Sequence, residues 1–99
     1  MIKLISIKKY EGSGNSRYTA TFNYTSFNKN KKVSFGDRRY DNYTIHKDDE
    51  RKRLYLLRHA GGNEEWNNPM TKGSLSRWIL WNKKTLNESI DDFKKRFKI

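Results

Sequence analysis

Hydrophobic and polar residues alternate along the first third of the chain with the period of a β-strand. In residues 17–24, aromatic and small apolar side chains occupy every second position, with threonine and asparagine between them. Residues 2–10 are rich in β-branched residues, and residues 32–35 alternate again before a glycine. Such alternation is typical of strands with one buried face and one face in water. The short loops between these segments predict an antiparallel meander of three strands.

Beyond residue 47 the pattern changes to the period of helices. Three acids at 48–50 precede a basic, leucine-rich segment over 51–58, and acids at its start suit the positive end of a helix dipole. The glycine pair at 61–62 predicts where this helix ends. A second helix is predicted to begin with Thr71 as its N-cap and to end near Asn82.

The third helix has the clearest signals. Thr85 and Glu88 match a capping box. Apolar residues follow at helical spacing, namely Leu86, Ile90, Phe93 and Phe97. Strands first and helices afterwards predict a single α+β domain over residues 1–99. Its small antiparallel β-meander in the N-terminal half is followed by about three helices packed on one face.

The net charge of the chain indicates the class of partner that it binds. Lysine and arginine number 22 against 11 acids, for a net charge of +11 and a pI near 10.0. Residues 1–47 hold 10 basic and 3 acidic residues, or +7, so the strand-rich part carries most of the excess. A field of this size is neutralised by counterions or by a polyanion, and a high pI is typical of nucleic-acid binding.

Several other chemistries have weak or no support in the residues. The chain has no cysteine, which excludes disulfides, cysteine-based zinc sites and cysteine nucleophiles. The glycine-containing segment 11–16 lacks the third glycine and the following helix of a phosphate-binding loop, so we expect a hairpin loop. The apolar stretch at 1–9 is too short for a signal peptide or a membrane span. We therefore expect an intracellular protein with no membrane partner.

His46 and His59 are the only histidines. A metal site needs three or four ligands, so acids such as Asp48 or Glu64 would have to join them. We expect no cofactor, no metal and no enzymatic activity. A metal-dependent activity using His46 and His59 remains the alternative.

A basic and aromatic segment spans residues 35–47. Arginine forks onto phosphate oxygens, and tyrosine stacks on an unpaired base. Alternatively, Tyr40 and Tyr43 anchor this loop to the core, while Asp37 and Asp41 neutralise its arginines. The pattern leaves both interpretations open.

A lysine cluster at 29–32 lies where a hairpin tip is predicted, and Lys8, Lys9 and Arg17 are expected on the same sheet. Such lysines bind phosphate without reading sequence, or they keep an edge strand soluble. The residues predicted to contact nucleic acid are Lys29, Lys31, Lys32, Arg38, Arg39, Tyr40 and Lys47. Near the C-terminal end, we expect Trp78 in the core and Trp81 against Trp66 or a partner.

Residues 33–97 resemble a family of small basic proteins of nucleocytoplasmic large DNA viruses, the giant viruses among them. The resemblance rests on the segments 43–48, 58–59, 65–67, 69–71 and 76–82, together with Phe35-Gly36, Arg51, Tyr55, Gly73 and the closing 93–97. The block Arg77-Trp78-x-Leu80-Trp81-Asn82 is its most specific part. The family's function is uncharacterised, so the resemblance implies a setting, the viral factory in the host cytoplasm or the virion, and no catalytic residues.

Taken together, these observations predict a protein that binds nucleic acid without sequence specificity, DNA rather than RNA, in genome condensation or packaging. The alternative is a structural protein of the virion, a minor capsid or core component that binds an acidic protein partner. A homodimer through the tryptophan-bearing helix is a further option, because small domains often bury surplus apolar surface in this way.

Overall fold

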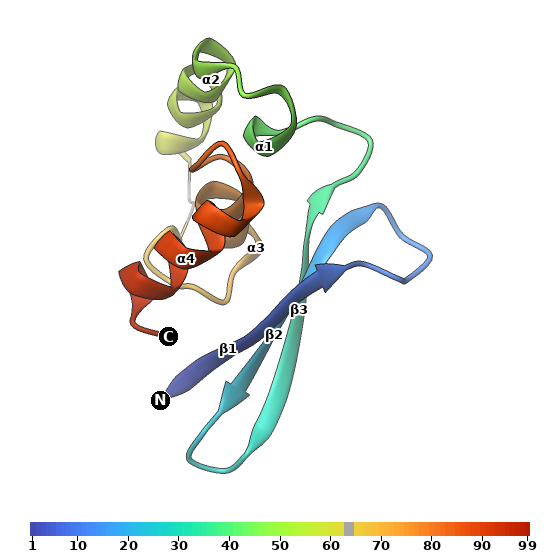
Figure 1. Ribbon diagram of the computed structural model, residues 1–99, viewed down its shortest axis with the longest axis vertical. Coiled ribbons are helices and arrows are strands. Elements are labelled where there is room, and N and C mark those ends of the chain that lie inside the picture. Colours follow the sequence, from blue (N-terminus) through green and yellow to red (C-terminus); the bar gives the residue numbers. More distant parts are fainter. Residues whose placement is uncertain (63–64) are drawn as a thin grey trace.

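Three antiparallel strands with a group of helices stacked on one side of them form the structure (Figure 1). This computed structural model describes residues 1–62 and 65–99. The strands are β1 (Ile2–Lys9), β2 (Ser16–Tyr24) and β3 (Lys29–Asp37), in the spatial order β1-β2-β3. The helices are α1 (Tyr43–His46), α2 (Asp49–Ala60), α3 (Lys72–Leu75), the π-helix η1 (Ser76–Leu80) and α4 (Leu86–Phe97). The predicted α+β fold, a meander followed by helices, is confirmed.

The register of the sheet assigns its side chains to two faces. Directly opposite residues of an antiparallel pair share a face, so Ala20, which pairs with Ile7 and with Val33, defines the core face. Between Leu4 and Ser6 the register shifts. This bulge keeps Leu4 and Ile7 on the core face although three positions separate them, and it leaves Ile5 55% exposed.

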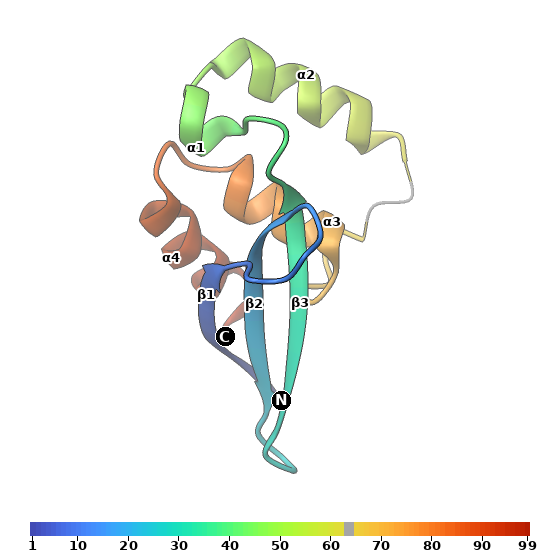
Figure 2. The same ribbon diagram turned by 90° about the vertical axis from the view of Figure 1, so that its right-hand side faces the viewer.

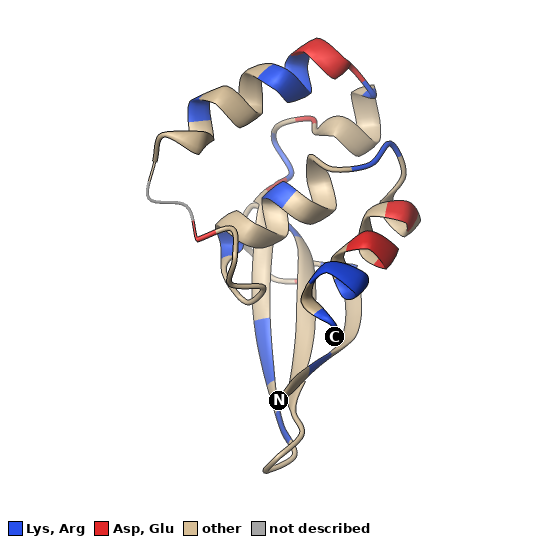
Figure 3. Ribbon diagram, turned by 90° about the vertical axis from the view of Figure 1, so that its left-hand side faces the viewer, with Lys and Arg blue, Asp and Glu red and all other residues tan. Residues whose placement is uncertain are grey.

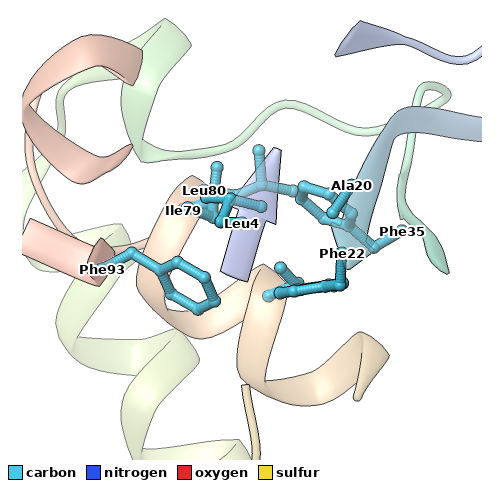
Figure 4. Packing of buried hydrophobic residues seen from close by; sticks show 8 residues of the cluster. Leu4, Ala20, Phe22, Phe35, Ile79, Leu80 and Phe93 are labelled. Carbon is cyan, nitrogen blue, oxygen red and sulfur yellow. The ribbon is translucent and has the colours of Figure 1, made fainter. Parts of the chain in front are cut away.

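The core lies between the sheet and the C-terminal helices (Figure 4). Phe22 and Phe35 from the sheet and Phe93 from α4 are fully buried. Leu75 and Ile79, from α3 and η1, complete this layer and are also fully buried. Burying each such ring or branched side chain stabilises the fold by roughly 1.5–3 kcal/mol, so a few large residues hold this small domain together.

Helix α2 begins at the predicted acids, and α4 begins at the predicted capping box. The Asp48 carboxylate accepts hydrogen bonds from the backbone N–H groups of residues 50 and 51 at the start of α2. Thr85 Oγ1 accepts from Glu88 N at 3.2 Å at the start of α4 and lies 2.8 Å from the Glu88 carboxylate. These side chains satisfy backbone donors that have no partner within the helix.

The predicted second helix is corrected. It begins after Thr71 as expected, but it is one turn of α-helix, α3, continued as the π-helix η1. Trp81 N donates to Ser76 O at 3.1 Å, a bond that spans five residues, and the helix ends at Leu80 instead of Asn82. The short helix α1 was not predicted. Asn42 caps it by accepting from Thr44 N.

Candidate nucleic-acid interface

The face of the sheet opposite the helices is open, and it is the face toward the viewer in Figure 2. The register places polar side chains on it throughout: Lys3, Ser6, Lys8, Thr19, Thr21, Asn23, Asn30, Lys32 and Ser34. Hydrogen bonds between side chains support this assignment, because Thr19 lies 3.0 Å from Ser34 and Asn23 donates to Asn30 at 2.8 Å. Over the described strands, every charged side chain that the register assigns to this face is basic.

A shallow depression lies in this open face. Lys8 and Lys32 line it from the outer strands, and Thr19, Thr21 and Ser34 form its floor. Glu11, from the loop between β1 and β2, lies at its rim. Hydroxyl groups and lysine side chains from three strands therefore converge on one surface, and they are the groups that bind phosphate oxygens.

The predicted lysine cluster at 29–32 is divided between the two faces. The hairpin turn lies at residues 25–28, so these lysines are in β3 and not at the tip. Lys31 pairs with Phe22 and therefore projects from the core-face side, whereas Lys32 pairs with Thr21 on the open face. Lys29 pairs with Tyr24 and shares the side of Lys31. The prediction of one shared cluster was wrong, since alternation separates neighbouring residues of a strand.

Arg17 links the open face to the loop after β3. Its guanidinium donates to the backbone oxygen of Tyr40 at 2.8 Å and to that of Arg38 at 3.4 Å. This bond holds residues 38–40 against the end of β2. Arg38 itself is exposed, and it lies at the same end of the sheet as Arg17.

The structure confirms the anchoring interpretation of the 35–47 segment for some residues and leaves others exposed. Arg39 is neutralised locally, because its guanidinium makes a bidentate contact with Asp37 at 2.7 and 3.0 Å. The hydrogen bond from Arg39 lowers the pKa of Asp37 to about 2. Tyr43 is buried and anchors the segment, but Tyr40 is 68% exposed and does not. Lys47 is exposed, and its ammonium donates to Thr44 O at 2.8 Å, in α1.

The structure thus separates the predicted contact residues into four groups. Lys32 lies on the open face, Lys29 and Lys31 lie on the other side of the hairpin, residues 38–40 lie beyond the far end of β3, and Lys47 lies at the end of α1. Lys3 and Lys8 complete the open face, and our prediction did not list them as contacts. The alternation of Thr19 and Thr21 with apolar residues indicated a polar face of the sheet. Only the register between β1 and β2, however, shows that Lys3 and Lys8 lie on that face.

A second concave surface lies between α2 and the loop at residues 37–42. The cavity has a volume of about 640 Å³. Its lining comes from the loop, from α2 and from η1 and the residue after it: Gly36, Asp37, Tyr40, Asp41, Asn42, Arg51, Leu54, Tyr55, Arg58, His59, Ser76, Leu80 and Trp81. We call this the α2 cleft. None of the residues of α2 is buried, so the helix stands away from the core.

Contacts with α1 and with residues 81–82 hold α2 in place. The Tyr43 hydroxyl donates to Asp49 at 2.5 Å, and Lys52 Nζ donates to the Asn82 backbone oxygen at 2.7 Å. The Tyr55 ring stacks on Trp81 with centroids 4.3 Å apart and an interplanar angle of 3°. These contacts fix one side of the helix, and the rest of its inner face borders the cleft.

Trp81 packs differently from the prediction. It contacts Tyr55 and also His46, with ring centroids 5.3 Å apart, whereas the Trp66 backbone oxygen accepts from Trp78 Nε1 at 2.9 Å. Trp78 packs against the core and carries the Arg96 guanidinium 3.7 Å from its ring centroid. Its expected place in the core is therefore confirmed, and the expected Trp81–Trp66 contact is wrong.

His46 is partly buried beside the Trp81 ring. Its Nδ1 accepts a hydrogen bond from Asp48 N at 3.0 Å. Burial, and then the nearby charge of Arg51, lower the pKa of His46 below its ordinary value. Both effects favour the neutral ring at physiological pH.

His46 and His59 are not part of a metal-binding cluster within residues 1–62 and 65–99, where no three His, Asp or Glu side chains come together to hold an ion. Glu64, one of the acids that the metal hypothesis would need, lies outside the described residues. Among the helices that the structure describes, none has the length and apolar character needed to span a bilayer.

Comparison with known proteins identifies the family of this chain. Neither the curated proteins nor the solved structures contain a match to this chain. A family model does match, over residues 7–59, which cover the last three residues of β1, all of β2 and β3, and α2 nearly to its end. The matched part therefore contains most of the open face and most of the α2 cleft. The chain belongs to the family of unknown function DUF5754.

Proposed function

We propose that this protein binds nucleic acid through the phosphate backbone and without reading sequence. The observation that carries the proposal is the open face of the sheet, on which the charged side chains of the described strands are all basic. Lys3, Lys8 and Lys32 are point charges for phosphate, and the hydroxyls of Thr19 and Thr21 lie between them. Contacts of this kind supply affinity and orientation but no sequence information.

The chemistry of this face favours a duplex over a single strand. Sheets that bind single strands carry aromatic side chains on which the bases stack. On the open face, the central strand presents Arg17, Thr19, Thr21 and Asn23, and the aromatic residue that lines the depression, Tyr10, comes from the loop after β1. A duplex presents its phosphates outward and needs no stacking platform. The resemblance of residues 33–97 to proteins of large DNA viruses adds the expectation that this duplex is DNA.

The experiment that tests the proposal is a binding titration of the nuclease-treated protein against duplex DNA, single-stranded DNA and RNA at two salt concentrations. We expect micromolar or tighter binding to the duplex at low salt, a weaker interaction with single strands, and a steep loss of affinity as salt rises. Two duplexes of unrelated sequence serve as matched ligands and should bind alike. Absence of binding to all of them at low salt would contradict the proposal.

A second function is favoured by a specific feature of α2. Leu54 and Leu57 are 43% and 61% exposed, and exposed arginines flank them at positions 53 and 58. Arg53 pairs with Glu50, but exposed apolar side chains beside Arg58 still suit an acidic protein partner, in agreement with a structural role in a virion. If a protein co-purifies after nuclease treatment and Leu57→Ser releases it, this alternative gains support; loss of every partner on nuclease treatment would count against it.

A further inference from the structure

The α2 cleft has the chemistry of a site for one nucleotide. The inner face of α2 presents the spacing i, i+3, i+4, i+7 and i+8 to the cleft, with Arg51, Leu54, Tyr55, Arg58 and His59 at these positions. In a globular domain, a stripe with this spacing normally packs on the core. Here the stripe lines the cleft, with Tyr55 stacked on Trp81. Its composition, charged at both ends and apolar between them, is that of a binding wall.

The arginines of this wall are available for an anion. Ion pairs among the described residues join Arg39 to Asp37, Arg53 to Glu50 and Arg96 to Asp92, and neither cleft arginine takes part in them. Arg51 and Arg58 are seven residues apart, so they lie on the same face of the helix with roughly 10 Å of rise between them. Exposed arginines without an acidic partner are suited to the bidentate recognition of phosphate.

The opposite wall supplies groups for a base and a sugar. Tyr40 borders the cleft and is 68% exposed, which makes its ring a surface on which a base can stack. Asp41 also borders the cleft and has no ion pair in the part of the chain that the structure describes. Its carboxylate can accept from a ribose hydroxyl or from an amino group of a base.

We propose that the α2 cleft binds a nucleoside phosphate, with the phosphate on Arg51 and Arg58 and the base against Tyr40. The volume of about 640 Å³ is within the range of small-molecule sites. The same chemistry is present in a free nucleotide and in the unpaired end of a strand. The inference rests on the proposed function in that it adds one recognised nucleotide to backbone binding, but the two use different surfaces and can fail separately.

The test is calorimetric titration of the full chain with adenosine 5′-monophosphate, adenosine and inorganic phosphate. We expect the nucleotide to bind at least tenfold more tightly than either fragment, because only the nucleotide engages both walls. Arg51→Gln with Arg58→Gln should weaken nucleotide binding at least tenfold. Arg53→Gln with Lys84→Gln is the matched control: it also removes two positive charges, both outside the cleft lining, and should bind as the parent does. Circular dichroism checks that each variant keeps its helices.

A second arm identifies the source of the nucleotide. A duplex with a 5′-phosphorylated single-stranded overhang is compared with a blunt duplex of the same length. Tighter binding of the overhang, lost in the double variant, assigns the cleft to a strand end; equal binding of the two, with the mononucleotide bound, assigns it to a free nucleotide.

Three results would overturn the inference: inorganic phosphate that binds as tightly as the nucleotide, equal losses in the control and the double variant, or a polyglutamate peptide that occupies the cleft more tightly. The nucleotide site can be tested separately from backbone binding, because a variant without the open-face lysines Lys3, Lys8 and Lys32 should lose duplex affinity and keep nucleotide affinity.

Discussion

The open face of the sheet makes a quantitative prediction about salt. The perturbation is the triple variant Lys3→Ala, Lys8→Ala and Lys32→Ala. Lys3 and Lys8 stand opposite Asn23 and Thr19, and Lys32 stands opposite Thr21, so the three lysines come from both outer strands of one face. All three are exposed, and their replacement should leave the core and the fold unchanged.

The magnitude follows from counterion release. Each duplex phosphate neutralised by a lysine contributes about −0.9 to the slope of log K against log salt concentration, so three lost contacts reduce its steepness by about 2.7. From about 50 to about 200 mM salt, the variant should therefore lose roughly 40-fold less affinity than the parent protein. The weakening should be the same on every sequence, because phosphate contacts carry no sequence information.

The assay is fluorescence anisotropy of two labelled duplexes of unrelated sequence, titrated at four or more salt concentrations. The control removes three lysines from the helical side of the molecule: Lys84→Ala, Lys94→Ala and Lys95→Ala. Figure 3 shows the basic and acidic segments on that side. The control has the same net charge as the open-face variant, so a difference between the two variants measures the position of the charges and not their number.

Two results would refute this reasoning. Equal slopes for the two triple variants would mean that the total charge, and not the open face, determines binding. An unchanged slope in the open-face variant would mean that these lysines touch no phosphate, and the contact surface would then have to be sought elsewhere.

Three further predictions concern the framework. Gly36 has φ +76°, and a Cβ there would lie 2.8 Å from Leu80 Cδ1, so Gly36→Ala should destabilise the fold by about 1–3 kcal/mol in urea unfolding. Thr85→Ala removes the cap of α4 and should cost about 1 kcal/mol in the same assay. Because the folded-state pKa of His46 is lowered, the unfolded chain binds more protons, and stability should fall as pH decreases below about 6.5. His46→Asn keeps an acceptor for Asp48 N and should flatten this pH dependence.

Each of these has an internal control. Gly61→Ala meets no atom within 4 Å and lacks a positive φ, so a loss there equal to that at Gly36 would contradict the steric argument. Thr85→Ser retains a hydroxyl and should recover most of the loss. For His46, an unfolding midpoint that falls equally with pH in the parent and the variant would attribute the acid sensitivity to other groups.

Much of the fold could be predicted because it depends on local chemistry. Alternation in 17–24 identified the buried Ala20 and Phe22, and short-range capping identified the beginning of α4 at Thr85. The helical spacing of Phe93 was likewise sufficient to assign it to the core. These features involve residues only a few positions apart, so the sequence specifies them directly.

The candidate sites could be predicted only in part. The charge excess was visible in the residues, but the exposure of Tyr40 and the placement of the lysines were not. Whether Lys31 and Lys32 share a surface depends on which residues of β2 stand opposite them, and Phe22 and Thr21 put them on different faces. Lys3 reaches the open face through pairing with a strand that lies some twenty residues away along the chain.

The sequence by itself determined the period of the three strands and of α2 and α4, the cap of α4, the order of strands before helices and the basic character of the domain. The tertiary structure alone decided which face of the sheet stays open, the bulge that keeps β1 in phase, and the position of α2 over a cleft and away from the core. The physical reason is range: capping and periodicity act within a few residues, whereas faces, bulges and clefts arise from pairing and packing between distant segments.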